Sequence, residues 1–144
     1  MTIDLLEIKS TELGKQVDFI GVVKKVYPIE PKVKVAVFEC RSCMRIHEVT
    51  QNILKKTCQP IVCQECGGRS FKLLENESTF TDIEYIEVGK VNSIHTIKVC
   101  IINPSRVIDL DDVGEPIRVF GEVGIVNNKN KLELVVLCSE ELPI

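Results

Sequence analysis

Apolar and polar residues alternate along most of this chain with the two-residue period of β-strands. The clearest case is the segment KVKVAVFE at 32–39, in which three valines lie on one side and the lysines, the alanine and the phenylalanine on the other. No segment has the length and period of a core-building helix, and only 1–13 is expected to form a short helical lead-in. The pattern therefore predicts a mainly β protein, with further strands at 16–27, 45–50, 70–74, 80–88, 94–102, 117–126 and 132–138.

Glycines and turn residues mark where these elements end or bend. Gly14 is a stop signal for the lead-in, and Gly21, in the middle of the first strand, predicts a bend or a β-bulge. The segment 127–130, Asn-Asn-Lys-Asn, consists of residues that tolerate the left-handed conformation, so it predicts a four-residue hairpin turn. We expect no internal repeat and no long linker.

Two Cys-x-x-Cys brackets, 40–43 and 63–66, are separated by nineteen residues. This spacing is typical of a tetrahedral zinc site with Zn–S bonds of about 2.3 Å. A site with four protein ligands leaves no position for water, so it predicts a structural and not a catalytic metal. We therefore expect one zinc ion, with the ligands Cys40, Cys43, Cys63 and Cys66.

The other uses of cysteine fit this chain less well. A thiol–disulfide centre would need a single bracket near a βαβ unit, and a disulfide framework would need an oxidising compartment. The acidic N-terminus does not resemble a signal peptide. Cys58 lies between the brackets and is an alternative ligand, whereas Cys100 and Cys138 lie in apolar strands and are expected in the core.

About five strands interrupted once by a zinc ribbon match the size and strand count of the five-stranded OB-fold barrel. We expect the barrel to be formed by 1–39 and 76–144. The ribbon at 40–75 would then be inserted between the second and third barrel strands.

Charge and motifs exclude several classes of function. The net charge is −3, so no global positive field favours nucleic acid, although the balance is +3 over residues 1–75 and −6 over 76–144. The sequence contains no phosphate-binding G-x-x-x-x-G-K-[ST] motif, and the two histidines, His47 and His95, are far apart. No apolar run reaches the length of about 18 residues that a membrane span needs. We expect neither an enzyme nor a membrane protein.

An OB-fold binds single strands on the face of its second and third strands and with its 1–2 and 4–5 loops. Tyr27 and Phe38 are the expected aromatic platforms on this face, whereas Phe19, Phe71 and Phe120 are expected in the core. The basic residues expected to contact nucleic acid are Lys24, Lys25, Lys32, Lys34, Arg118, Lys129 and Lys131.

Three segments carry a resemblance to a known family: STELGKQVDFIGVVKKVYPIEPKVKVAVFECRSC at 10–43, CQECGGRSF at 63–71, and PSRVIDLDDVGEPIRVFGEV at 104–123. In this order they resemble the N-terminal region of the archaeal and eukaryotic minichromosome maintenance (MCM) replicative helicases. The resemblance implies an OB-fold with an inserted zinc ribbon, in a region that encircles DNA as part of a hexameric ring. It also implies that the zinc modules join two rings, and that Lys32 and Arg118 occupy basic positions of the family.

We expect three departures from this family: no helical N-terminal subdomain, no AAA+ ATPase, and a short last hairpin. We therefore predict a non-catalytic module that contacts single-stranded or duplex DNA in replication, with a homo-hexamer or other MCM-type subunits as partners. Its location would be cytoplasmic with the nucleoid, or nuclear in a eukaryote. The alternatives are an RNA-binding zinc-ribbon OB protein of translation or transcription, and a pure protein–protein scaffold.

Overall fold

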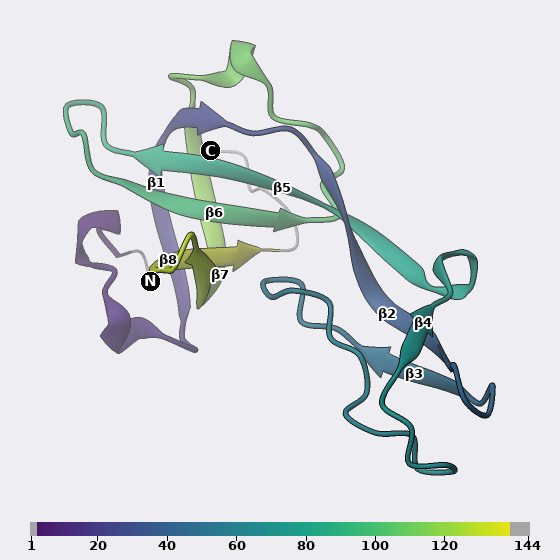
Figure 1. Ribbon diagram of the computed structural model, residues 1–144. Coiled ribbons are helices and arrows are strands. Elements are labelled where there is room, and N and C mark those ends of the chain that lie inside the picture. The colour runs from purple at the N-terminus through teal and green to yellow at the C-terminus, as the bar shows by residue number, and fades with distance from the viewer. Residues whose placement is uncertain (1–2, 139–144) are drawn as a thin grey trace. The chain divides into compact units, whose positions relative to one another are not determined.

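The computed structural model describes residues 3–138 (Figure 1). The chain divides into two compact units, one from the residues up to Glu30 together with those from Asp82 on, and the other from Pro31–Thr81. Within the described part of the chain, no helix is long and apolar enough to cross a membrane. The protein is mainly β, as the alternation predicts, and its helical elements are short 3₁₀ turns.

Five strands form the first unit: β1 (Gln16–Val26), β5 (Thr79–Gly89), β6 (Thr96–Ile102), β7 (Pro116–Asn128) and β8 (Lys131–Cys138). β1 pairs antiparallel with β5 and β7, β5 with β6, and β7 with β8, while β6 and β8 pair in parallel. These pairings close a barrel in the order β1–β5–β6–β8–β7–β1. This connectivity, with one parallel pair and a return to the first strand, is that of the OB-fold.

The insertion point differs from the one expected. The strand that continues the barrel from β1 is β5, which follows the cysteine segment, and β2 (Glu30–Cys40) instead pairs with β3 and β4 in the second unit. The insert therefore lies between the first and second barrel strands. The ribbon predicted at 40–75 falls inside the unit Pro31–Thr81, and its boundaries stay a prediction.

The bulge in β1 lies three residues after the glycine that suggested it. The pairing of β1 with β5 shifts register between Val23 and Lys25, so Lys24 is the extra residue. A β-bulge reverses the inside–outside alternation, and for this reason Val26 packs against the core while Lys25 is exposed. Gly21 has another role, because a Cβ there would lie 2.7 Å from Val88 Cγ1 and 2.8 Å from the Gly89 carbonyl oxygen.

The lead-in forms two 3₁₀ turns, η1 (Leu5–Glu7) and η2 (Ser10–Glu12), and the chain turns at Gly14 with a φ of 80°. A similar unit occurs one hundred residues later, where η4 (Leu110–Asp112) leads through Gly114, with a φ of 92°, into β7. The structure thus contains a short repeat of local geometry that the sequence patterns did not predict.

The two copies of this turn-and-strand motif form reciprocal hydrogen bonds with each other. The Gly14 N–H donates to the Val123 carbonyl (2.9 Å), and the Gly114 N–H donates to the Val23 carbonyl (2.7 Å). In return, the Val123 N–H donates to Lys15 and the Val23 N–H to Glu115, both at 3.0 Å. The β1–β7 pair therefore has an approximate two-fold relation.

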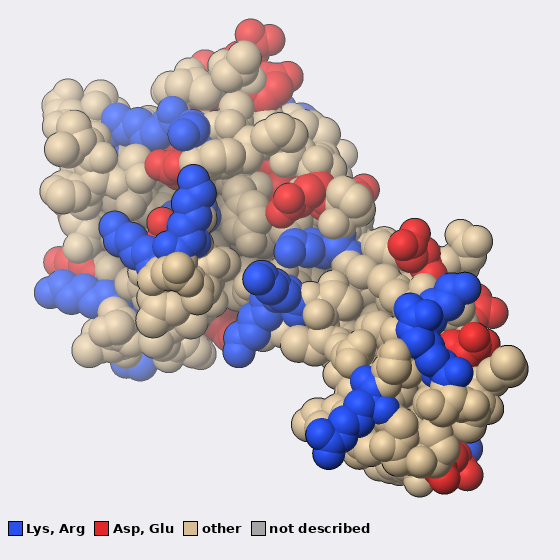
Figure 2. Space-filling view, in the orientation of Figure 1, with Lys and Arg blue, Asp and Glu red and all other residues tan. Residues whose placement is uncertain are grey.

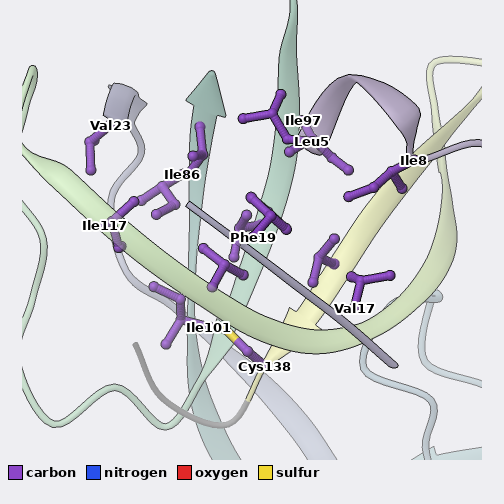
Figure 3. Close-up of a cluster of buried hydrophobic side chains, with 14 of the residues drawn as sticks. Leu5, Ile8, Val17, Phe19, Val23, Ile86, Ile97, Ile101, Ile117 and Cys138 are labelled. Atoms are coloured by element: carbon purple, nitrogen blue, oxygen red, sulfur yellow. The ribbon is translucent and has the colours of Figure 1, made fainter. Parts of the chain in front are cut away.

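The barrel core is aliphatic and packs around Phe19, which is completely buried (Figure 3). Val17 and Val23 point inward from β1, and the lead-in contributes Leu5 and Ile8. Every strand of the barrel supplies inward residues at alternate positions, as the two-residue period predicts. The other labelled core residues are Ile86, Ile97, Ile101, Ile117 and Cys138.

The second unit has a small core of its own. β3 (Ile46–Thr50) and β4 (Phe71–Leu73) pair with β2, and the short turn η3 (Glu75–Glu77) follows β4. The core holds Ala36, Phe38, Cys40, Cys63 and Phe71. Phe38 is only 5% exposed, so the expectation that it forms an aromatic platform at the surface was wrong.

Two further details at β7 correct the predicted picture. β7 and β8 stay paired up to Asn128 and Lys131, so the hairpin turn has two residues instead of four. Lys129 and Asn130 have φ values of 51° and 66°, the left-handed geometry of the hairpin turns whose twist matches that of the strands. Phe120, which was expected in the core, lies on the outer face and is half exposed.

Candidate metal centre and nucleic-acid face

The four bracket cysteines converge at one point of the second unit. Their Sγ atoms all lie within 4.8 Å of one another. Cys40 and Cys66 are 3.5 Å apart at sulfur, and Cys43 and Cys63 are 3.6 Å apart. A tetrahedral site with metal–sulfur bonds of about 2.3 Å has sulfur–sulfur edges of about 3.8 Å, so the four thiols fit a single ion such as zinc.

The two brackets have the same backbone geometry, which explains why their thiols point to one place. In the first, the Met44 N–H donates to the Cys40 carbonyl at 2.9 Å, and Met44 has a φ of 66°. In the second, the Gly67 N–H donates to the Cys63 carbonyl at 2.8 Å, with a φ of 74° at Gly67. Each bracket is thus a tight turn closed by a left-handed residue directly after its second cysteine.

Backbone N–H groups approach the sulfurs closely. The Gly68 N–H donates to the Cys66 Sγ at 3.4 Å, and a Cβ on Gly68 would lie 3.2 Å from that sulfur and 3.4 Å from the Cys40 Sγ. Hydrogen bonds from the backbone of Cys43 and Ser42 lower the pKa of the Cys40 thiol to about 6. The pKa of the Cys43 and Cys66 thiols is raised beside the other cysteines, so Cys40 is the first thiol of the cluster to lose its proton.

Neither Cys58, the alternative ligand, nor the histidine between the brackets joins this cluster. Cys58 is exposed, and its thiol donates to the Lys56 carbonyl. His47 packs edge-on against the ring of Phe71, with centroids 5.4 Å apart. Within residues 3–138, the four bracket cysteines are the group of His, Cys, Asp and Glu side chains that is arranged for a metal.

A row of alternating charge crosses the outer face of the barrel. Lys25 on β1 pairs with Glu87 on β5, Glu87 pairs with Lys98 on β6, and the Lys98 Nζ lies 3.4 Å from Glu133 Oε2 on β8. Figure 2 shows blue lysines and arginines interleaved with red aspartates and glutamates over the region of β5, β6 and the β7–β8 hairpin. The bulge at Lys24 is what turns Lys25 toward this face.

Two tyrosines lie among these charges. The Lys98 ammonium is 5.6 Å from the ring centroid of Tyr27 and 5.4 Å from that of Tyr85, and the Lys25 ammonium is 5.0 Å from that of Tyr27. The Tyr27 hydroxyl donates to Glu87, which raises the pKa of the tyrosine and lowers the pKa of the carboxyl. Burial raises the pKa of Tyr85. Of these residues the sequence singled out Tyr27, as an aromatic platform, and Lys25, whereas Tyr85 and Lys98 were not singled out.

The alternation of β6 contains the signal for Lys98. It stands between the inward residues Ile97 and Val99, so period two already places it on the outer face. The same two-residue period places Tyr85 on the outer face of β5, because its neighbours Glu84 and Ile86 are buried.

The structure distributes the seven predicted basic residues over several places. Lys25 lies on the charged row, and Lys129 and Lys131 lie at the β7–β8 turn beside it. The Lys24 ammonium instead donates to the Val91 carbonyl at 3.2 Å. The two lysines on β2, Lys32 and Lys34, belong to the second unit.

Arg118 is held by a carboxylate. Its Nε and Nη2 donate to the two oxygens of Asp18 at 3.0 and 2.6 Å. The arginine lowers the pKa of Asp18, and the carboxylate raises the pKa of the guanidinium. A phosphate at this position would have to compete with Asp18, although 45% of the arginine side chain is exposed.

A family model described as "MCM OB domain" matches residues 4–96. An uncharacterised MCM-type protein of Methanocaldococcus jannaschii is 36% identical over 84 residues, which are 57% of this chain and 12% of that protein. The DNA replication licensing factor MCM6 of Oryza sativa subsp. indica is 31% identical over 91 residues, 61% of this chain and 11% of that protein. The chain thus matches about one-ninth of the length of these curated relatives.

A solved structure is similar over nearly the whole chain. The N-terminal domain of an archaeal MCM aligns with a TM-score of 0.77 and 24% identity, over 94% of this chain and 58% of that one. At this identity the likeness shows the fold, and it agrees with the closed barrel read from the strand pairings.

Proposed function

Because the chain belongs to the family of MCM OB domains, we propose that it is a non-catalytic module that contacts single-stranded DNA in replication, in the compartment that holds the chromosome. The observation that supports this most directly is the outer face of β5 and β6. There Tyr85 and Lys98 are accompanied by Lys25 and Tyr27 from the end of β1, and the face continues to the hairpin lysines. β5 and β6 are the second and third strands of the barrel, and the β7–β8 hairpin is its 4–5 loop. An OB-fold binds single strands with these elements.

The charged row shapes how this contact would work. Lys98 and Lys25 are each next to the Glu87 carboxylate, so this part of the face is nearly neutral. It would orient a bound DNA strand more than it would attract one. Lys129 and Lys131 are exposed and would supply the phosphate contacts. Each phosphate contact adds a slope of about 0.7 in the dependence of log affinity on log salt concentration.

The test is fluorescence anisotropy with a labelled thymidine oligonucleotide at several salt concentrations. The double variant K129E/K131E is expected to weaken binding at least about tenfold at low salt and to reduce the salt slope by about 1.4. The control is K9E/K15E, which makes the same charge change on the exposed lead-in. Equal losses in both variants would show that the hairpin has no special role.

RNA is the principal rival ligand. The same face would accept a ribose strand, since stacking and backbone contacts are tolerant of the sugar. A direct competition between DNA and RNA oligonucleotides of the same sequence distinguishes the two. Tighter binding of RNA would contradict a role in replication and favour the translation or transcription alternative.

We propose that the four clustered thiolates bind one structural zinc ion. The donor set and its spacing support this, because tetrahedral Cys₄ sites are typical of zinc. The ion would hold the two bracket turns together. The four cysteines would complete its tetrahedral coordination and leave no position for water or substrate. Elemental analysis of protein purified without added metal should find one zinc per chain, and a content far below one would refute the assignment.

The second unit also presents apolar side chains that support an assembly role. Met44 is 72% and Ile61 89% exposed, and Ile46 and Val62 add to the exposed apolar surface of the same unit. We propose that these side chains contact a further MCM-type subunit, as hexamer or paired-ring partners. Sedimentation velocity of the wild type and of M44D/I61D tests this. If the chain is monomeric at high concentration with and without DNA, the assembly role fails.

A further inference from the structure

A cleft of about 400 Å³ lies on the outer face of the barrel unit. Its lining includes Tyr27, Lys98, Asn128 and Glu133, from β1's end, β6 and the β7–β8 hairpin. This volume is in the range of sites that hold one small ligand or one ring system of a larger one. The lining is mainly polar, so a ligand would be recognised by hydrogen bonds.

The two carboxylates of this cleft differ in how strongly their oxygens are hydrogen-bonded. Glu87 accepts the hydroxyl of Tyr27 through one oxygen and the hydroxyl of Thr96, at 2.9 Å, through the other. Glu133 has weaker partners: the Lys98 ammonium is 3.4 Å away, and the Asn128 amide is 3.5 Å away. An ionised carboxylate has about four acceptor sites, so Glu133 retains acceptor capacity toward the cleft.

The two oxygens of a carboxylate with spare acceptor sites select ligands with two parallel N–H donors. Among the nucleobases, guanine alone has two adjacent donors, the ring N1–H and the 2-amino group, on its Watson–Crick edge. Adenine and cytosine place one amino group beside an acceptor nitrogen, and thymine and uracil have one N–H between two carbonyls. In a single strand this edge is available to a protein.

We propose that the cleft is a nucleobase subsite that selects guanine within a single strand, with Glu133 as the residue that reads the base. Lys98 and Lys25 lie next to the cleft and offset the carboxylate charges, which lowers the repulsion of the flanking phosphates. This inference rests on the proposed single-strand binding and adds base selection to it.

The experiment compares thymidine dodecamers that carry one central guanine, hypoxanthine or adenine, by fluorescence anisotropy with the full chain. Hypoxanthine is guanine without its 2-amino group, so the pair isolates one donor. A bidentate contact to a base is worth about 1–3 kcal/mol, so guanine should bind about tenfold more tightly than adenine, with most of the gain lost for hypoxanthine.

The variant E133Q replaces one acceptor oxygen by a donor amide and should reduce the guanine preference to less than about twofold. Its affinity for the plain thymidine dodecamer should be equal or slightly higher, because a negative charge is removed. E122Q, which makes the same change on the exposed outer side of β7, is the matched control and should keep the preference. Thermal unfolding of both variants verifies that they fold.

The possible outcomes separate this inference from the proposed function. Equal affinity for guanine and hypoxanthine in the wild type, or a preference that survives in E133Q, overturns the subsite and leaves single-strand binding standing. Failure to bind any of the dodecamers at low salt overturns both.

Discussion

The backbone of β1 packs very closely at Gly21, beside Val88 and Gly89 of the paired strand β5. A Cβ would lie within 3.0 Å of the Leu5 Cδ2 as well as of Val88 and the Gly89 carbonyl. These three atoms belong to two buried side chains and to the backbone, so they have little freedom to move. A glycine read from the sequence as a bend is in fact a site of close approach.

Gly21→Ala should therefore lower the free energy of unfolding by about 1–3 kcal/mol, as overpacked cores do. Urea denaturation followed by circular dichroism measures it. The neighbouring Ile20→Ala removes an exposed side chain and serves as control, with a change of about 0.5 kcal/mol or less. If both variants unfold at the same urea concentration as the wild type, the close contact has no energetic importance.

The Asp18–Arg118 pair predicts a specific dependence of stability on pH. Arg118 lowers the pKa of Asp18 in the folded state below its value in the unfolded chain. The pair therefore stabilises the fold above the unfolded-state pKa of about 3.9, and its contribution is lost as pH falls through the folded-state pKa.

Asp18→Asn should unfold at a lower urea concentration than the wild type at pH 7, and this difference should shrink below about pH 4. A series of urea midpoints between pH 7 and pH 2 measures it. A gap between the two proteins that stays constant down to pH 2 would contradict the ion-pair explanation.

Strand alternation predicts elements well here, because the barrel is nearly all sheet and each strand has one buried face. All eight strands lie within a few residues of their predicted ranges. The spacing of the cysteines likewise identified the four residues that the fold brings together. Patterns of this kind depend on residues close together in the sequence, so they can be read without knowing which strands pair.

Pairing between distant strands is what alternation leaves undetermined. Nothing in the segment 32–39 distinguishes a barrel strand from one that pairs with β3 and β4, so the insert was placed one strand too late. The same holds for Phe38 and Phe120, since a period of two gives two faces and does not say which of them is covered. Each phenylalanine was assigned to the wrong face.

The β7–β8 turn gives an element-scale prediction. Asn130 has a φ of 66°, a conformation that glycine adopts freely and β-branched residues avoid. Asn130→Gly should preserve or raise the melting temperature, whereas Asn130→Val should cost about 1–2 kcal/mol. Thermal unfolding of the two variants beside the wild type gives the order, and a valine variant as stable as the glycine variant would contradict the turn geometry.

At the scale of the molecule, the two units should differ in how they depend on metal. The second unit has a small core, in which two of the five buried residues are bracket cysteines. Metal binding to small Cys-rich modules supplies on the order of 10 kcal/mol of apparent free energy at neutral pH, so this unit should not fold without it. The barrel has its own larger core and needs no such support.

Cys63→Ser, or a chelator, should therefore unfold the residues of the second unit and leave the barrel signals in place. Two-dimensional amide NMR spectra report both units in one experiment. Cys58→Ser is the matched control, because this exposed cysteine lies outside the cluster. Loss of barrel signals together with those of the second unit would show that the two fold as one cooperative body.

The reciprocal bonds between Gly14 and Val123 and between Gly114 and Val23 have a consequence for local opening. Val123 and Val23 lie just beyond the two ends of the β1–β7 ladder, and each binds the turn that precedes the other strand. Neither end can therefore fray without breaking bonds made by both halves of the repeat. The four amide protons of these residues should exchange with solvent together and only at the rate of global unfolding of the barrel. Hydrogen exchange that proceeds faster at one end than at the other would show that the two halves open independently.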